Sequence, residues 1–169
     1  PRLVGNDGLK RPNGLNDGLM KNCLLYDEWI MREVEKGNIS SVDFADLTGT
    51  DIWLHGHCHQ KALVGVEKTA ECLRLTGATV HIIPSGCCGM AGSFGYEKEH
   101  YQTSMAIGEM VLFPTIRQAV SVDDGQCTMH NSKVIVSAPG TSCRQQILDG
   151  TGITALHPIE ILYQNIYGN

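Results

Sequence analysis

Four cysteines are the residues of this sequence best suited to hold an inorganic group. Cys87 and Cys88 are adjacent, inside the glycine-rich run 85–92, whereas Cys58 and Cys143 each lie far from them along the chain. Neighbouring side chains of an extended chain point to opposite faces, so the adjacent pair needs a turn to aim both sulfurs at one point, and the flanking glycines allow such a turn. Thiolates hold iron–sulfur clusters and zinc ions. The pattern therefore indicates a metal site, with a packed pair of free thiols as the plain alternative.

Three histidines accompany Cys58 in the run 55–59. In a strand, His55, His57 and His59 would share one face and Cys58 would lie on the other, so all four side chains cannot bind one metal. We expect His57 or His59 to be the ligand if any imidazole is one. The remaining histidines would then donate hydrogen bonds to the ligands or carry protons.

The spacing of the cysteines favours a cluster over a single zinc ion. Zinc sites are usually built from short hooks such as C-x-x-C, but 29 positions separate Cys58 from Cys87 and 55 separate Cys88 from Cys143. Adjacent cysteines also suit a centre with several metal atoms better than one tetrahedral ion. Zinc stays open as an alternative because it binds thiolates and imidazoles well. A third reading is a thiol enzyme in which Cys87 or Cys88 is the nucleophile.

The order of the predicted elements explains how distant cysteines could meet. Alternating strands and helices are typical of an α/β domain, here with a mainly parallel sheet of about four strands between helices in a three-layer, Rossmann-like arrangement. Such sheets bind ligands outside the carboxyl ends of their strands, which is where each of the four cysteines is expected. The predicted strands are 51–58, 78–84, 133–138 and 153–156, and the predicted helices are 18–36, 61–76, 96–120 with a kink or break at Pro114, 142–148 and 158–167.

Length and composition indicate one soluble domain. We expect an irregular lead-in over residues 1–18, which are rich in glycine and asparagine, and a single domain over 19–169. A net charge of −5 without a Lys/Arg cluster argues against a nucleic-acid partner, and no apolar run is long enough to cross a bilayer. Seven cysteines without a signal peptide favour a reducing, cytoplasmic location. The start at Pro1 suggests a fragment of a longer polypeptide.

The other cysteines and two basic residues have simpler expected roles. Cys23, Cys72 and Cys127 lie away from the predicted strand ends, so we expect them to pack as small hydrophobic residues. Lys61 and Arg144 begin helices close to the predicted site. Either cation could offset the negative charge of several thiolates or meet an acidic partner.

Three segments resemble the cysteine-rich CCG domain. They are 57–59 (His-Cys-His), 86–89 (Gly-Cys-Cys-Gly) and 137–145 (Ser-Ala-Pro-Gly-Thr-Ser-Cys-Arg-Gln). The family includes one of the subunits of heterodisulfide reductase and the iron–sulfur subunits of glycolate oxidase and anaerobic glycerol-3-phosphate dehydrogenase. It also includes the carboxyl-terminal part of large FAD-linked oxidases of the D-2-hydroxy-acid dehydrogenase type, to which the fuller run 55–63 is most similar.

The resemblance implies that Cys58, Cys87, Cys88 and Cys143 hold an iron–sulfur cluster of the 4Fe-4S kind or a metal ion, and that electrons pass through this domain. It further implies flavin and ferredoxin-like domains in the same polypeptide, through which the protein could lie at a membrane surface. FAD would belong to the parent protein, since this chain has no G-x-G-x-x-G fingerprint. One departure is Gly140, where the family often has cysteine, and this keeps a zinc-stabilised docking module without redox activity as the alternative.

Overall fold

The computed structural model describes residues 23–121 and 133–166, and within these ranges a parallel sheet forms the centre of the domain. Strands β1 (Thr50–Leu54), β2 (Thr79–Ile82) and β3 (Lys133–Ser137) are arranged in the order β2-β1-β3, and both pairings are parallel. Ile52 of β1 lies opposite Val80 on one side and Ile135 on the other. The predicted α/β class with a mainly parallel sheet is confirmed.

The predicted fourth strand is a shorter feature than expected. Leu156 pairs with Ser137 as an isolated parallel bridge, held by Ala138 N–H to Leu156 O and Leu156 N–H to Val136 O, both 2.9 Å. The segment therefore runs beside β3 like a strand, but its pairing does not extend far enough to count as one. Among the described residues the sheet has three strands and this bridge.

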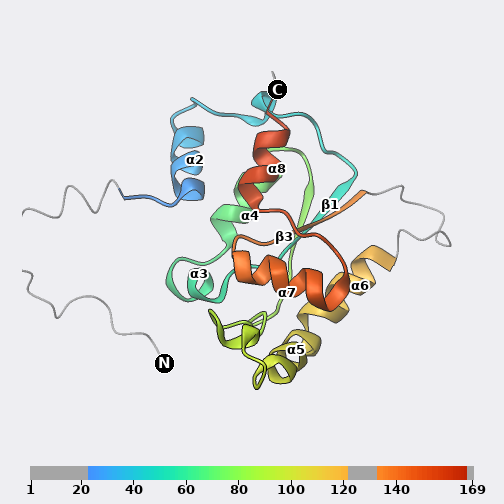
Figure 1. Cartoon of the computed structure of the whole chain (residues 1–169). Coiled ribbons are helices and arrows are strands. Elements are labelled where there is room, and N and C mark those ends of the chain that lie inside the picture. Colours follow the sequence, from blue (N-terminus) through green and yellow to red (C-terminus); the bar gives the residue numbers. More distant parts are fainter. Residues whose placement is uncertain (1–22, 122–132, 167–169) are drawn as a thin grey trace, which may run out of the picture.

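Helices cover both faces of the sheet, as Figure 1 shows. One face packs a hydrophobic cluster that includes Ile52 and Leu54, and the other packs a cluster that includes Val136 and the buried side chains of Cys88 and Cys143. The helices are α2 (Tyr26–Glu35), α3 (Cys58–Leu63), α4 (Glu67–Arg74), α5 (Tyr101–Met110), α6 (Leu112–Ser121), α7 (Thr141–Thr151) and α8 (Pro158–Gln164), with short 3-10 turns η1 (Ser41–Asp43) and η2 (Phe94–Tyr96).

Several predicted boundaries are wrong for identifiable reasons. The strand predicted over 51–58 ends at Leu54, and α3 already begins at Cys58. The helix predicted over 61–76 is two helices, because Gly65 has a φ of +81°, which an α-helix cannot contain. The helix predicted over 96–120 is also two, and the break expected near Pro114 occurs at Val111.

Three further predictions concern residues that lie partly or wholly outside the ranges 23–121 and 133–166. The irregular lead-in at 1–18, the start of the helix predicted over 18–36 and Cys127, which was predicted to pack, lie outside the described residues. Within the described ranges, no helix combines the length and the apolar character needed to cross a membrane.

Candidate metal centre

The segments that follow the three strands bring the predicted cysteines to one end of the sheet. His55 and Cys58 follow β1, the double-cysteine loop follows β2, and Cys143 is the third residue of α7, which follows β3. Figure 1 shows α3, α7 and the loop between β2 and α5 gathered in the same part of the molecule. The predicted convergence at the carboxyl ends is thus what the fold produces.

At the centre of this region, three buried side chains could hold one metal ion. His55, Cys88 and Cys143 each offer a ligand atom, and these atoms all lie within 4.8 Å of one another. The exposed fractions of the three residues are 0%, 4% and 1%. Two thiols and an imidazole are a common ligand combination for zinc and are compatible with iron.

Cys58 and Cys87 lie at the outer side of this group. Cys58 is exposed and Cys87 is half-buried, and neither belongs to the buried group of three. Both lie on the segments that carry the inner group, Cys87 next to Cys88 and Cys58 at the start of α3. The four predicted cysteines thus divide into an inner, buried pair, Cys88 and Cys143, and a more accessible outer pair, Cys58 and Cys87.

The inner cysteines share a proton. The Cys143 thiol donates a hydrogen bond to Cys88, and this is the main reason that the pKa of Cys88 falls to about 4 although burial opposes the change. The His55 imidazole and the Met90 N–H also stabilise the Cys88 thiolate. The pKa of Cys143 rises because its proton is held by Cys88 and because its side chain is buried. At neutral pH the pair carries one thiolate, which is the form that binds metal.

Cys87 differs from its neighbour in sequence. Burial raises its pKa, while the Gly89 N–H, which donates to Cys87 Sγ at 3.3 Å, and the Ala91 N–H act in the opposite direction. Among the adjacent pair, Cys88 is therefore the readier metal ligand in the metal-free protein, and Cys87 is the one that solvent reaches.

His55 is the imidazole of the buried group, and sequence reasoning did not single it out. Its Nδ1 shares a hydrogen bond with Ser85 Oγ at 2.7 Å, whereas its Nε2 is buried without a hydrogen-bond partner of normal geometry. Burial is the largest cause of a lowered His55 pKa, so the ring is neutral, as a metal ligand must be. A buried imidazole beside two thiols, with one ring nitrogen that has no hydrogen bond of normal geometry, fits a metal ligand. The signal available in the sequence was the position of His55 directly after the apolar run 52–54.

His57 and His59, the imidazoles predicted as ligands, lie nearer the surface. His57 is the N-cap of α3, and its Nδ1 accepts a hydrogen bond from the His59 N–H at 3.3 Å. His59 is exposed. Neither is in the buried group of three, and a ligand role for either stays a prediction.

Two glycines bring backbone close to the site. A Cβ on Gly140 would lie 2.7 Å from His57 Cδ2 and 2.9 Å from Cys143 Sγ, so the backbone of this loop passes directly against the centre. Gly89 has a φ of +105°, and a Cβ there would lie 2.2 Å from the Ser104 carbonyl oxygen. The chain after Cys88 can take this path only with glycine.

The two predicted cations bind backbone carbonyls around the centre. Lys61 Nζ donates to the Ser85 carbonyl and, at 3.4 Å, to that of Gly86. Arg144 donates to the carbonyls of Ala138 and Pro139 at 3.1 and 3.0 Å. Each side chain thus supports one of the loops that carry the cysteines.

The remaining described cysteines differ from each other. Cys72 is fully buried in the other hydrophobic cluster, and its thiol donates to the Asp27 carbonyl at 3.5 Å, which agrees with a packing role. Cys23 is exposed, so the packing role predicted for it is wrong.

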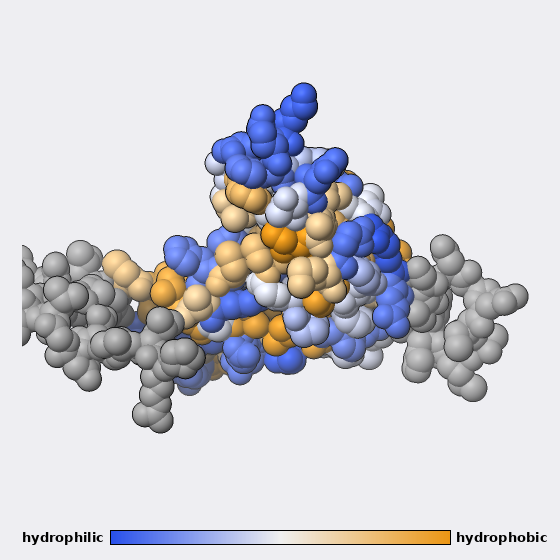
Figure 2. All heavy atoms as spheres, turned by 90° about the horizontal axis from the view of Figure 1, so that it is seen from below, coloured by the Kyte–Doolittle hydropathy of each residue, from blue (hydrophilic) through white to orange (hydrophobic). Residues whose placement is uncertain are grey.

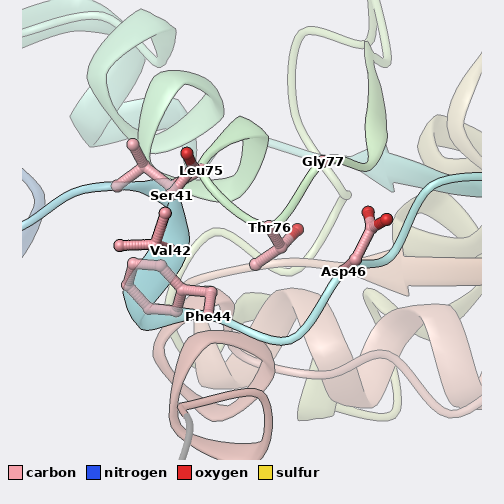
Figure 3. Close-up of a pocket in the computed structure, with 7 residues that line it drawn as sticks. All are labelled: Ser41, Val42, Phe44, Asp46, Leu75, Thr76 and Gly77. Atoms are coloured by element: carbon pink, nitrogen blue, oxygen red, sulfur yellow. The ribbon is translucent and has the colours of Figure 1, made fainter.

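One pocket adjoins the metal centre and another does not. A pocket of about 400 Å³, whose lining residues are drawn in Figure 3, includes Asp46 and Gly77, which precede β1 and β2, and no cysteine or histidine lines it. A pocket of about 300 Å³ adjoins the centre through His57 and Gly140 and is otherwise bounded by Leu25, Tyr26, Asp27, Gln60 and Pro139.

Comparison with known proteins finds relatives among dehydrogenases. The chain is 29% identical over 150 residues to a subunit of the anaerobic glycerol-3-phosphate dehydrogenase of Escherichia coli K12, covering 88% of this chain and 34% of that protein. It is 29% identical over 149 residues to D-2-hydroxyglutarate dehydrogenase of the same organism, covering 86% of this chain and 13% of that protein. The corresponding enzyme of Pantoea ananatis is 27% identical over 148 residues, with the same coverage.

The chain thus spans about a third of one relative and about an eighth of the others. No family model matches it, and no solved structure matches it. The sequence resemblance to these two kinds of dehydrogenase is confirmed, and the chain is homologous to a part of larger oxidoreductases.

Proposed function

We propose that this chain is the CCG-type, metal-binding and electron-transferring domain of a larger FAD-linked dehydrogenase that oxidises a D-2-hydroxy acid. The observation that carries the proposal is the buried group of His55, Cys88 and Cys143, whose ligand atoms all lie within 4.8 Å of one another. The names of the relatives support dehydrogenase chemistry, and D-2-hydroxyglutarate dehydrogenase supports the substrate class.

The donor set fits an iron–sulfur cluster. Cys88 and Cys143 would be inner ligands, Cys58 and Cys87 outer ligands, and His55 would bind the metal or donate to a cluster sulfur. When bound, such a cluster accepts and donates single electrons. The chain's own residues exclude water from the inner side and leave Cys58 and part of Cys87 open to solvent.

The open side is where a redox partner would come close. We expect that partner to be a flavin or ferredoxin-like domain of the parent polypeptide, since the chain covers a small part of its relatives. The distribution of hydrophobic residues on the face that includes α5 and the double-cysteine loop supports this expectation. Figure 2 shows hydrophobic residues in the middle of that face and hydrophilic residues around them, as in many protein interfaces.

Anaerobic reconstitution with iron and sulfide tests the proposal. The wild type should gain broad visible absorption, and Cys88→Ser should lose it because an inner ligand is removed. Cys23→Ser is the matched control, since Cys23 is exposed and is not one of the four predicted ligands. Absence of the absorption in the wild type, or its persistence in Cys88→Ser, would contradict the cluster.

Zinc is the second candidate because the buried group is compact. With Zn–S distances near 2.3 Å and Zn–N distances near 2.0 Å, the donors around one zinc ion lie roughly 3.5 Å apart, within the 4.8 Å that encloses the three atoms here. In that case the chain is a zinc-stabilised docking module. Elemental analysis should then give about one zinc per chain, and a chelator should lower the melting temperature.

The thiol-enzyme reading has less support. Cys88 has the lowered pKa that a nucleophile needs, but it is 4% exposed and faces the buried group rather than solvent. Cys87 is more accessible, but burial raises its pKa. Neither thiol combines access with reactivity.

A further inference from the structure

Lys61 connects the chain segments that carry three of the four cysteines. It belongs to α3, whose first residue is Cys58, and its ammonium group donates to the carbonyls of Ser85 and Gly86, directly before Cys87 and Cys88. A Cβ on Gly56 would lie 3.0 Å from Lys61 Cε, so the lysine stem passes against the chain that leaves β1. The half-buried side chain thus links the segments after β1 and β2.

The same ammonium group places a positive charge beside the loop that carries Cys87 and Cys88. Burial, the largest cause, lowers the pKa of Lys61, whereas a thiolate at any of the four cysteines would raise it. Arg144, the other cation expected near the centre, donates to carbonyls of the loop before α7 instead. Lys61 is therefore the cation that binds the backbone directly before Cys87 and Cys88.

We propose that Lys61 is a positioning and charge-balancing residue of the metal centre. It holds the double-cysteine loop against the start of α3, and its positive charge stabilises the more negative, reduced state of the bound group. The redox half of this inference rests on the proposed function, whereas the positioning half holds for any metal bound by these cysteines.

Three substitutions separate the two roles. Lys61→Met removes both the donor and the charge, Lys61→Gln keeps a donor without the charge, and Lys61→Arg keeps both. Lys68→Met is the matched control, because Lys68 is exposed on α4. If Lys61→Met does not fold, Lys61→Gln still tests the charge.

The reduction potential of the reconstituted protein tests the charge. Reduction adds a negative charge to the centre, so Lys61→Met and Lys61→Gln should have a more negative potential than wild type, with Lys61→Arg and Lys68→Met close to wild type. A wild-type potential in Lys61→Gln would overturn the charge-balancing role.

Zinc affinity, measured by competition with a chelator, tests positioning without any redox chemistry. Loss of a partner that orients metal ligands weakens binding roughly 10- to 100-fold, and we expect this for Lys61→Met but not for Lys68→Met. Wild-type affinity in Lys61→Met would overturn the positioning role. If the wild type binds zinc but no cluster, the proposed electron transfer fails while this measurement still decides the role of Lys61.

Discussion

The chemistry of each site residue depends on its surroundings more than on its type. Cys87 and Cys88 are neighbours, yet burial raises the pKa of one and the Cys143 hydrogen bond lowers the pKa of the other. His55 and His57 are two positions apart, yet one is buried beside thiols and the other caps a helix. The sequence indicated the cysteines as candidate ligands. It could not indicate which histidine lies beside them, because that depends on where β1 ends.

Gly140 gives the first prediction at this scale. Gly140→Ala should destabilise the protein by about 1–3 kcal/mol and weaken metal binding, since its Cβ would lie 2.9 Å from Cys143 Sγ and 2.7 Å from His57 Cδ2. Urea unfolding and metal competition measure the two effects. Gly86→Ala is the control, because a Cβ there meets nothing within 4 Å, and equal losses in both variants would contradict the prediction.

The pH dependence of the metal-free protein is a second prediction. Burial lowers the pKa of His55 and of His157 below the value near 6.5 that they have in the unfolded chain. Between the folded-state pKa and about pH 6.5, the unfolded chain therefore binds more protons than the folded protein. This contribution to stability is complete above about pH 6.5 and is lost as the pH falls through the folded-state pKa values, and the lowered pKa of Cys88 acts in the same direction.

Urea midpoints measured in chelator at about pH 7.5 and about pH 5.5 check this sign. We expect the lower midpoint at the acidic pH, where ordinary carboxylates still contribute little to the difference. An unchanged or higher midpoint at about pH 5.5 would show that these groups do not titrate as their burial implies.

At the scale of elements, the site residues follow the ends of the three strands, and contacts between helices stabilise the loops that carry them. Gln146 of α7 is 2% exposed and donates to the Ser104 carbonyl at 3.1 Å and to the Ser104 hydroxyl at 2.9 Å. The Ser104 carbonyl is also the atom that a Cβ on Gly89 would meet. This contact joins α7, α5 and the double-cysteine loop.

Gln146→Ala should therefore lower the free energy of unfolding by about 1–3 kcal/mol, because it removes two buried hydrogen bonds. Its neighbour is a matched control: Gln145 bonds Asp149 in an exposed setting, so Gln145→Ala should change stability by roughly 0.5 kcal/mol or less. Chemical denaturation of both variants measures the difference. Equal effects would mean that the contact beneath the loop does not stabilise the fold.

The element pattern shows what sequence reasoning can and cannot supply. The alternation of strands and helices predicted the parallel sheet and the meeting of the cysteine segments at the carboxyl ends of its strands, because the connections in such folds are strongly constrained. The break at Gly65 was missed because the apolar periodicity continues across it, whereas the break expected at Pro114 lies close by, at Val111. The fourth strand was overpredicted because the segment 153–156 has strand character but only one bridge.

At the scale of the whole molecule, the chain corresponds to one part of larger enzymes. It covers 34% of one relative and 13% of another, and its outer cysteines face solvent, where another domain would approach. On the proposed function, substrate oxidation would occur in other parts of the larger protein, and this chain would pass the electrons on.

X-ray absorption spectroscopy of the metal-loaded protein tests the central claim most directly, because it reports the atoms bound to the metal. We predict that sulfur from Cys88 and Cys143 binds the metal together with one imidazole, whose signature is lost in His55→Gln but not in His59→Gln. A metal bound only by oxygen atoms, or no metal uptake with either zinc or iron and sulfide, would contradict the account.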